Sequence, residues 1–192
     1  MKKYNIIAGV PRAGKSTVSQ MIAKRMGYQH ISMDSILAGI EKVFPETQVD
    51  TDAPVEPQKN LAFISSKMAP FIRVMMESGE YDECDYGVVI DVFQLLPKDY
   101  LDFIENEKSE VYYFLSSDVT PEERFRILKA YDTPNDYTYY HSEEENKRDC
   151  IDIVNISHLM KEQCILYGLS YYETSHHREL VLDEFLSYLD KK

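Results

Sequence analysis

The side chains with the clearest chemical meaning lie in one short segment near the N-terminus. They match the pattern G-x-x-x-x-G-K-[ST] without exception, over Gly9, Val10, Pro11, Arg12, Ala13, Gly14, Lys15, Ser16 and Thr17. Glycines let such a loop turn its backbone N–H groups toward a phosphate, and a helix that begins at Lys15 adds free N–H groups and a positive dipole end. Lys15 would reach the β- and γ-phosphates, and the Ser16 hydroxyl would be a Mg²⁺ ligand. The segment predicts a nucleoside triphosphate site.

The surrounding sequence supports this prediction. An apolar run, residues 4–8, precedes the loop, and a helical pattern over residues 15–26 follows it. Strand, loop and helix in this order are the context that the motif requires. The alternative is a chance glycine-rich turn, which composition would produce in about one chain in a hundred of this length. The match and its context together favour the phosphate site.

Asp34 is the second residue whose type and place could do chemistry. It lies two residues past a short run, residues 28–32, that predicts a strand, so its side chain would face the phosphate loop. An Asp there could orient an acceptor hydroxyl and take its proton during phosphoryl transfer. The alternative is a helix N-cap, because Asp is a preferred capping residue.

Strands and helices alternate along the chain and would bring these residues to one edge of a sheet. Short apolar runs predict strands over residues 4–8, 28–32, 86–91, 110–115 and 169–173. Helical spacing, capping boxes and stops at glycine predict helices over residues 15–26, 34–44, 61–78, 97–106, 121–130, 143–167 and 179–189. Such alternation gives a five-stranded parallel sheet with helices on both faces, a three-layer α/β/α fold. Ligands then bind at the carboxyl ends of the strands.

Two polar segments interrupt this pattern. Residues 45–57 contain three of the eight prolines and predict an exposed loop, while residues 131–141 are rich in Tyr and also predict a loop. Helical spacing resumes directly after residue 57, so we expect one domain over residues 1–192. Pro70 is expected to kink the helix that contains it.

Composition excludes several classes of protein. The chain has 21 Lys and Arg against 33 Asp and Glu, a net charge of −12, which argues against binding to nucleic acid or an anionic membrane. No apolar run approaches the roughly 18 residues of a membrane span, and the apolar N-terminal run is too short for a signal peptide. Cys84, Cys150 and Cys164 are scattered and predict free thiols. We expect a soluble cytoplasmic protein, either a monomer or a homodimer.

Two further patterns carry no functional prediction. Residues 146–149 read Asn-Lys-Arg-Asp and match the guanine-reading N-K-x-D motif, but they fall inside a predicted helix and not at a strand end. His176 and His177 are adjacent, which is poor geometry for binding one metal ion, so they predict surface residues.

With the phosphate loop and the element order established, the chain resembles the P-loop small-molecule kinases, among them adenylate kinase, shikimate kinase and chloramphenicol phosphotransferase. The resemblance in element order covers nearly the whole chain, but only the phosphate loop matches residue by residue. It implies that Mg²⁺–ATP donates its γ-phosphoryl group to a hydroxyl of a small molecule. Residues 35–80 would then form the acceptor-binding insert, and residues 131–141 a lid.

The resemblance also implies a metal site. Residues 88–93 are similar to the apolar run plus Asp-Gly-Phe of adenylate kinase, whose Asp holds Mg²⁺ through water. Asp91 would take that role beside Ser16; the alternative is a carboxylate that ends a strand at a polar turn. The Arg that follows in adenylate kinase and binds the acceptor phosphate is missing here, which weakens a nucleoside monophosphate as acceptor.

Three arginines flank the implied lid. Arg124 and Arg126 lie in the helix before it and Arg148 in the helix after it, where the resembling kinases place arginines on ATP and the transferring phosphoryl group. The alternative for each is a solvated helix surface.

Two rival functions stay open. One is an NTPase or a nucleotide-sensing regulator without a small-molecule acceptor, and the other is a binding protein that keeps the loop only as part of its fold. A polynucleotide kinase is disfavoured by the net charge of −12.

Overall fold

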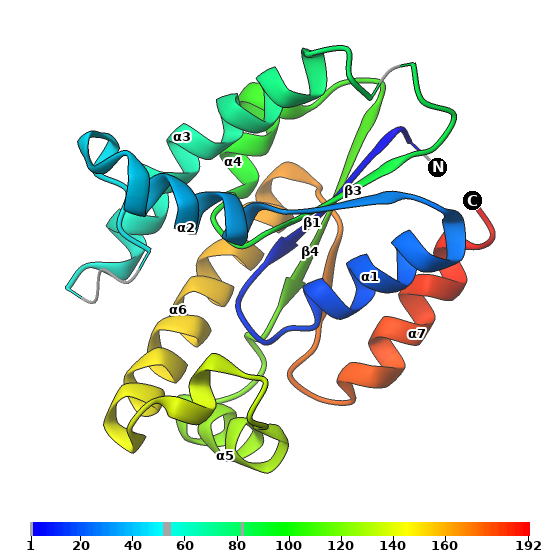
Figure 1. Cartoon of the computed structure of the whole chain (residues 1–192). Helices are drawn as coiled ribbons and strands as arrows, with labels where there is room; N and C mark the ends of the chain where they lie inside the picture. The colour runs from blue at the N-terminus through cyan, green and yellow to red at the C-terminus, as the bar shows by residue number, and fades with distance from the viewer. Residues whose placement is uncertain (1, 52–54, 82) are drawn as a thin grey trace.

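The computed structural model of the chain describes residues 2–51, 55–81 and 83–192 (Figure 1). Its strands are β1 (Tyr4–Gly9), β2 (Gln29–Ser32), β3 (Val88–Val92), β4 (Ser109–Leu115) and β5 (Tyr171–Glu173). They form one parallel sheet in the order β2-β3-β1-β4-β5. The predicted five-stranded parallel sheet is therefore confirmed.

The sheet order places the phosphate loop at its centre. β1 is buried along its whole length and pairs with β3 on one side and β4 on the other, with Ile7 opposite both Asp91 and Tyr112. Because β2 and β3 lie on one side of β1 while β4 and β5 lie on the other, the loops beyond the carboxyl ends diverge around β1. A crevice at this point is where open α/β sheets bind ligands.

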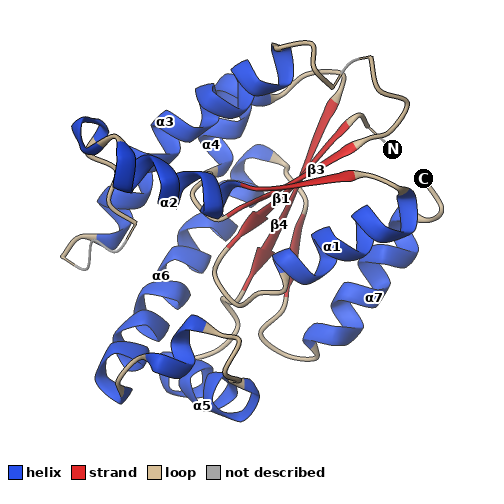
Figure 2. Ribbon diagram, in the orientation of Figure 1, coloured by secondary structure: helices blue, strands red, loops and turns tan. Residues whose placement is uncertain are grey.

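Helices cover both faces of the sheet and complete three layers (Figure 2). They are α1 (Lys15–Met26), α2 (Met33–Val43), α3 (Pro57–Glu77), α4 (Pro97–Asp99), α5 (Pro121–Tyr131), α6 (Glu143–Tyr167) and α7 (Arg178–Leu189). The chain also has 3₁₀ turns η1 (Pro45–Thr47) and η3 (Tyr137–Tyr140) and a π-helical turn η2 (Tyr100–Ile104). α1 and α7 lie side by side on one face, whereas α3, α4 and α6 cover the other (Figure 1).

Most helix ends follow from signals in the neighbouring residues. The capping boxes at Thr120 and Ser142 both form, because each side chain accepts from the third helical N–H and the Glu there accepts from the cap N–H. Gly27 ends α1, as predicted, and Gly168 ends α6; both adopt the left-handed conformation. Pro70 lies inside α3, which stays helical on both sides of it.

Three segments differ in detail from the prediction. The helix expected over residues 97–106 is a single α turn followed by η2, whose wider turn places both Tyr100 and Ile104 in the core. α3 begins at Pro57, one turn earlier than its apolar stripe suggested, because proline suits the first helical position. The loop expected over residues 45–57 contains η1, and its residues 52–54 lie outside the described part of the chain.

The cysteines are free thiols, as expected. Cys150 and Cys164 are buried and Cys84 is half-buried. Among the residues that the structure describes, none of the helices combines the length and the apolar character that crossing a bilayer requires.

Candidate active site

The loop between β1 and α1 has the backbone geometry of a phosphate cradle. Gly9, Arg12 and Gly14 have φ angles of 125°, 62° and 97°. At Gly9 a Cβ atom would lie 2.0 Å from the carbonyl oxygen of Phe114, so only glycine fits. No acidic side chain lies in the first turn of α1, and no side chain of the described residues caps it. The N–H groups at this helix start are therefore available to an anion.

Lys15 lies at the base of this loop with its side chain turned inward. Only 5% of the residue is exposed, and Nζ donates a hydrogen bond to the Val10 carbonyl oxygen at 2.9 Å. Burial lowers the pKa of Lys15, while the charges of Asp91 and Asp34 raise it. The ammonium therefore lies near two carboxylates, within the loop that would hold a phosphate.

Asp34 lines the cleft near the phosphate loop. The N-cap of α2 is Ser32, so Asp34 is an early residue of the helix and not its cap. Its side chain lines the main cleft and is open to water, yet the surrounding protein partly desolvates it and raises its pKa. The charge of Lys15 and a backbone hydrogen bond from Phe93 oppose that rise. Asp34 therefore interacts with both the phosphate loop and the loop after β3.

Asp91 is buried near the end of β3 and has an unsatisfied oxygen. Its Oδ1 has no hydrogen-bond partner among the described residues, and its Oδ2 lies 3.8 Å from Nε2 of His30. Buried carboxylates normally have partners, so an unpaired oxygen next to the phosphate loop is consistent with a missing ligand. Mg²⁺ prefers oxygen ligands and keeps several waters, and the exposed Ser16 hydroxyl offers a second oxygen.

Ser16 and Asp91 would not complete a metal site by themselves. Within the described ranges, no group of three or more His, Cys, Asp or Glu side chains is arranged to hold a metal ion. The two residues therefore fit Mg²⁺ only if phosphate oxygens and water complete the coordination, as they do in nucleotide sites.

A cleft of about 1140 Å³ opens from the phosphate loop. One wall comes from α2 and α3 and the other from α6 and residues 131–141, and Figure 1 shows these elements on either side of the sheet's carboxyl edge. The lining residues are Pro11, Arg12, Gly14, Lys15, Ser16, Thr17, Asp34, Thr51, Pro57, Asn60, Leu61, Ile64, Phe93, Gln94, Tyr131, Asp136, Tyr137, His141, Glu145, Arg148, Asp149, Asp152, Ile156 and Arg178. Its volume exceeds that of a typical single-ligand pocket, so it has room for a nucleotide and a small acceptor.

The three arginines that the sequence suggested as nucleotide ligands lie in different environments in the structure. Arg124 is buried and its Nη2 donates to the Pro11 carbonyl oxygen at 3.2 Å, while its Nε has no partner among the described residues. Burial is the main cause of its lowered pKa, and the charges of Arg12 and Arg178 add to it. Arg148 lines the cleft from α6. Arg126 is exposed, and neither Arg124 nor Arg126 lines the cleft.

Arg12 links the phosphate loop to residues 131–141. Its guanidinium lies 3.7 Å from Asp132, forms an ion pair with Asp136 and donates to the Tyr131 carbonyl oxygen at 3.5 Å. The segment expected to act as a lid therefore contacts the loop that it would cover.

Several cleft residues were not singled out from the sequence. Arg178 is the first residue of α7, and the signal that could have found it is its place in the loop after the fifth strand. Gln94 follows β3 by two residues, where ligand-binding loops are expected. Asp149 and Asp152 gave no local signal, because only the packing of α6 decides which of its faces meets the cleft. His176 and His177 are exposed, as predicted.

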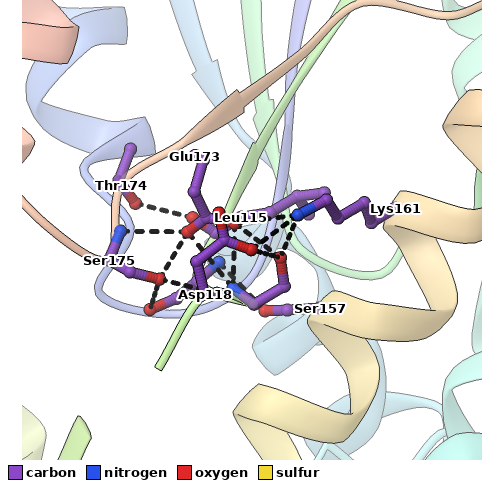
Figure 3. Close-up of polar contacts among 9 residues, drawn as sticks. Leu115, Asp118, Ser157, Lys161, Glu173, Thr174 and Ser175 are labelled. Atoms are coloured by element: carbon purple, nitrogen blue, oxygen red, sulfur yellow. Dashed lines mark hydrogen bonds and ion pairs between the residues drawn. The ribbon is translucent and has the colours of Figure 1, made fainter. Parts of the chain in front are cut away.

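A polar network joins the segments that follow β4 and β5 to α6 (Figure 3). The Glu173 carboxylate accepts from the backbone N–H groups of Ser117 at 3.1 Å and Ser175 at 3.0 Å, and from both serine hydroxyls. Lys161 of α6 donates to Asp118 at 2.6 Å. These bonds tie the ends of β4 and β5 to α6. They therefore fix the loops that lead to Arg124 and Arg178 at the phosphate end.

Comparisons with known proteins agree with this architecture. No protein-family model matches the sequence, and no curated protein sequence matches it significantly. The fold is similar to shikimate kinase from Bacteroides thetaiotaomicron, with a TM-score of 0.56, 16% identity and 99% of each chain covered. Shikimate kinase from Acinetobacter baumannii in complex with shikimate gives a TM-score of 0.52 at 16% identity, covering 100% of this chain and 96% of that one.

A third solved structure has a similar fold. Deoxyadenosine kinase from M. mycoides with bound dATP gives a TM-score of 0.51 at 16% identity, covering 97% of this chain and 99% of that one. Identities at this level are evidence for the fold alone. The chain therefore has the three-layer α/β/α fold shared by these P-loop small-molecule kinases.

Proposed function

We propose that this protein is an ATP-dependent phosphotransferase that moves the γ-phosphoryl group of Mg²⁺–ATP to a hydroxyl of a small molecule. The observation that supports it is the meeting of Lys15 and Asp34 in one cleft, directly beside a glycine-dependent phosphate cradle. A loop retained only for folding would not need a buried ammonium facing a carboxylate that lies open in a cleft.

The phosphate end of the cleft would hold the nucleotide. The N–H groups of the loop and of the first turn of α1 would bind the β- and γ-phosphates, and Lys15 would exchange its bond to Val10 for phosphate oxygens. Arg124 would neutralise charge that develops on the transferring group, because a buried guanidinium with a free N–H is already oriented and desolvated.

Asp34 would act on the acceptor. Its carboxylate can accept a hydrogen bond from the acceptor hydroxyl, orient the oxygen toward the γ-phosphorus and take the proton as the new bond forms. Its raised pKa makes it a better base than an ordinary Asp. Mg²⁺ would be held by Ser16 and, through water, by Asp91, and would supply charge neutralisation on the phosphates.

The proposal is tested in two steps with the full chain. Calorimetry with ATP and Mg²⁺ measures nucleotide binding, and a metabolite library is then screened for acceptor-dependent formation of ADP. We expect Lys15→Ala to abolish measurable ATP binding, and Asp34→Asn to bind ATP normally while losing at least about 100-fold in kcat. Lys24→Ala is the matched control, because Lys24 is an exposed residue of the same helix.

Each outcome separates the proposal from its rivals. ATP hydrolysis that no metabolite stimulates would favour a nucleotide-hydrolysing regulator. Absence of ATP binding in the wild-type protein would favour a binding protein that keeps the loop as part of its fold. Unchanged transfer by Asp34→Asn would remove Asp34 from the role of base.

A further inference from the structure

The charges that line the cleft are unevenly distributed. Its carboxylates are Asp34, Asp136, Glu145, Asp149 and Asp152, and its cations are Arg12, Lys15, Arg148 and Arg178. Arg12 is already paired with Asp136, and Lys15 lies in the phosphate loop. The wall formed by α6 and the floor near α2 therefore carry more negative than positive charge, even though a kinase must also bind an anionic nucleotide.

Of the three α6 carboxylates that line the cleft, Asp152 is the one without a hydrogen bond or ion pair among the described residues. It is half-buried. Asp149, three residues earlier on the same helix face, lies 3.3 Å from Nδ1 of His141, and Glu145 is used in the capping box of α6. Burial and the charge of Asp149 raise the pKa of Asp152, while Arg148 lowers it. A cationic ligand would relieve this repulsion.

Gln94 independently indicates a ligand in the same cleft. The residue is 7% exposed, it lines the cleft, and its Oε1 has no hydrogen-bond partner among the described residues. A buried side-chain amide without a partner is rare in proteins and is explained when a ligand supplies the missing bond. Gln94 follows Phe93, whose backbone N–H interacts with Asp34, so the amide and the candidate base lie at the same part of the cleft floor.

Apolar side chains complete this half of the cleft. Leu61 and Ile64 come from α3 and Ile156 from α6, one turn beyond Asp152. They would contact the hydrocarbon part of an acceptor, while the polar groups around them fix its orientation.

We propose that the acceptor is a small hydroxyl compound that also carries a cationic amine. Asp152, with Asp149 beside it, pairs with the ammonium group, Gln94 hydrogen-bonds a polar substituent, and Asp34 receives the reacting hydroxyl. This assignment rests on the proposed phosphotransferase function and names its substrate class. An acceptor that carries a carboxylate would meet like charge on the α6 wall and would be disfavoured.

The transfer step balances with the groups already named. The acceptor oxygen forms a bond to the γ-phosphorus, the bond from the γ-phosphorus to the β–γ bridging oxygen breaks, and its electron pair stays on ADP. The hydroxyl proton passes to the Asp34 carboxylate and then to water. The ammonium group takes no part in the bond changes, so Asp152 is a specificity-determining residue.

Matched acceptors test the charge preference directly. The full chain with Mg²⁺–ATP is assayed for phosphorylated product on sets of acceptors whose members differ in one substituent, an amine, a neutral group or a carboxylate. The first set is glucosamine, glucose and glucuronate, and the second is ethanolamine, ethylene glycol and glycolate. The third consists of the amine, neutral and carboxylate members of a wider library of hydroxyl compounds. We expect transfer to be confined to amine-bearing members. For those members Asp152→Asn should raise KM by about tenfold or more with little change in kcat, because it removes a binding charge and no reacting group.

The control variant is Glu144→Gln, which changes an exposed carboxylate of the same helix that does not line the cleft, and it should leave KM unchanged. Transfer to neutral or carboxylate members at equal or higher kcat/KM overturns the proposal, as does an unchanged KM in Asp152→Asn. Transfer to none of the compounds by a protein that binds ATP also overturns it. Failure to bind ATP is a different result, because it refutes the phosphotransferase function itself.

Discussion

Gly9→Ala is the substitution whose effect on the free energy of unfolding follows most directly from the structure. Gly9 has a φ of 125°, a region that L side chains rarely adopt, and a Cβ atom there would lie 2.0 Å from the Phe114 carbonyl oxygen. The same oxygen accepts the hydrogen bond from the Val10 N–H at 3.1 Å. Relief of the clash must therefore separate the end of β1 from β4 and break this bond.

Both contributions can be given magnitudes. Forcing a side chain into an unfavourable backbone region costs about 1–3 kcal/mol, and a buried hydrogen bond left unmade costs about 1–3 kcal/mol. We expect Gly9→Ala to lower the free energy of unfolding by about 4 kcal/mol, a large part of the roughly 5–15 kcal/mol that holds a domain together. With a urea m-value of about 2 kcal/mol/M, the unfolding midpoint should fall by about 2 M.

Urea unfolding followed by circular dichroism measures this shift. Gly39→Ala is the matched control, because Gly39 is inside α2, has no positive φ, and leaves open space within 4 Å of the point where an added Cβ atom would lie. There alanine should raise the free energy of unfolding by about 0.5–1 kcal/mol through its better helix propensity. A midpoint change in Gly9→Ala of less than about 0.5 M would refute the reasoning, since the loop would then tolerate a side chain at its first residue.

Further predictions concern the arginines, the polar network and pH. Arg124→Met should weaken ATP binding, measured by calorimetry, about tenfold or more without lowering stability, because it removes a buried cation that has no carboxylate partner among the described residues. Arg126→Met should change neither ATP binding nor stability. Equal effects of the two variants on ATP binding would contradict this prediction. Glu173→Ala should lower the free energy of unfolding in urea by about 2–4 kcal/mol, because it leaves the N–H and hydroxyl donors of two serines without an acceptor. A change under about 0.5 kcal/mol would contradict a stabilising role of the network. Desolvation raises the pKa of Asp34, so kcat/KM should fall on acidification at a pH above the ordinary Asp value, and the same profile in Asp34→Asn would assign the titration to another group.

Local sequence determined the parts of this protein whose energetics are local. The phosphate loop depends on glycines at fixed spacing, and its backbone adopts the positive φ angles that the glycines permit. Helix ends followed from capping boxes at Thr120 and Ser142, in which neighbouring residues satisfy free N–H groups. The alternation of strands and helices was enough to predict a parallel sheet, since parallel strands need a crossover between them.

Tertiary structure decided which side chains lie at the phosphate loop and in the cleft. Arg124 and Arg126 lie close together on one helix and have the same chemistry, but the packing of α5 buries the first against the phosphate loop and leaves the second in solvent. Gln94 and Asp152 come from segments far apart in the chain, and no local pattern indicated that Asp152 would face the cleft. Side chains on a helix meet a ligand or water according to how that helix packs, and packing depends on contacts between residues distant in the chain.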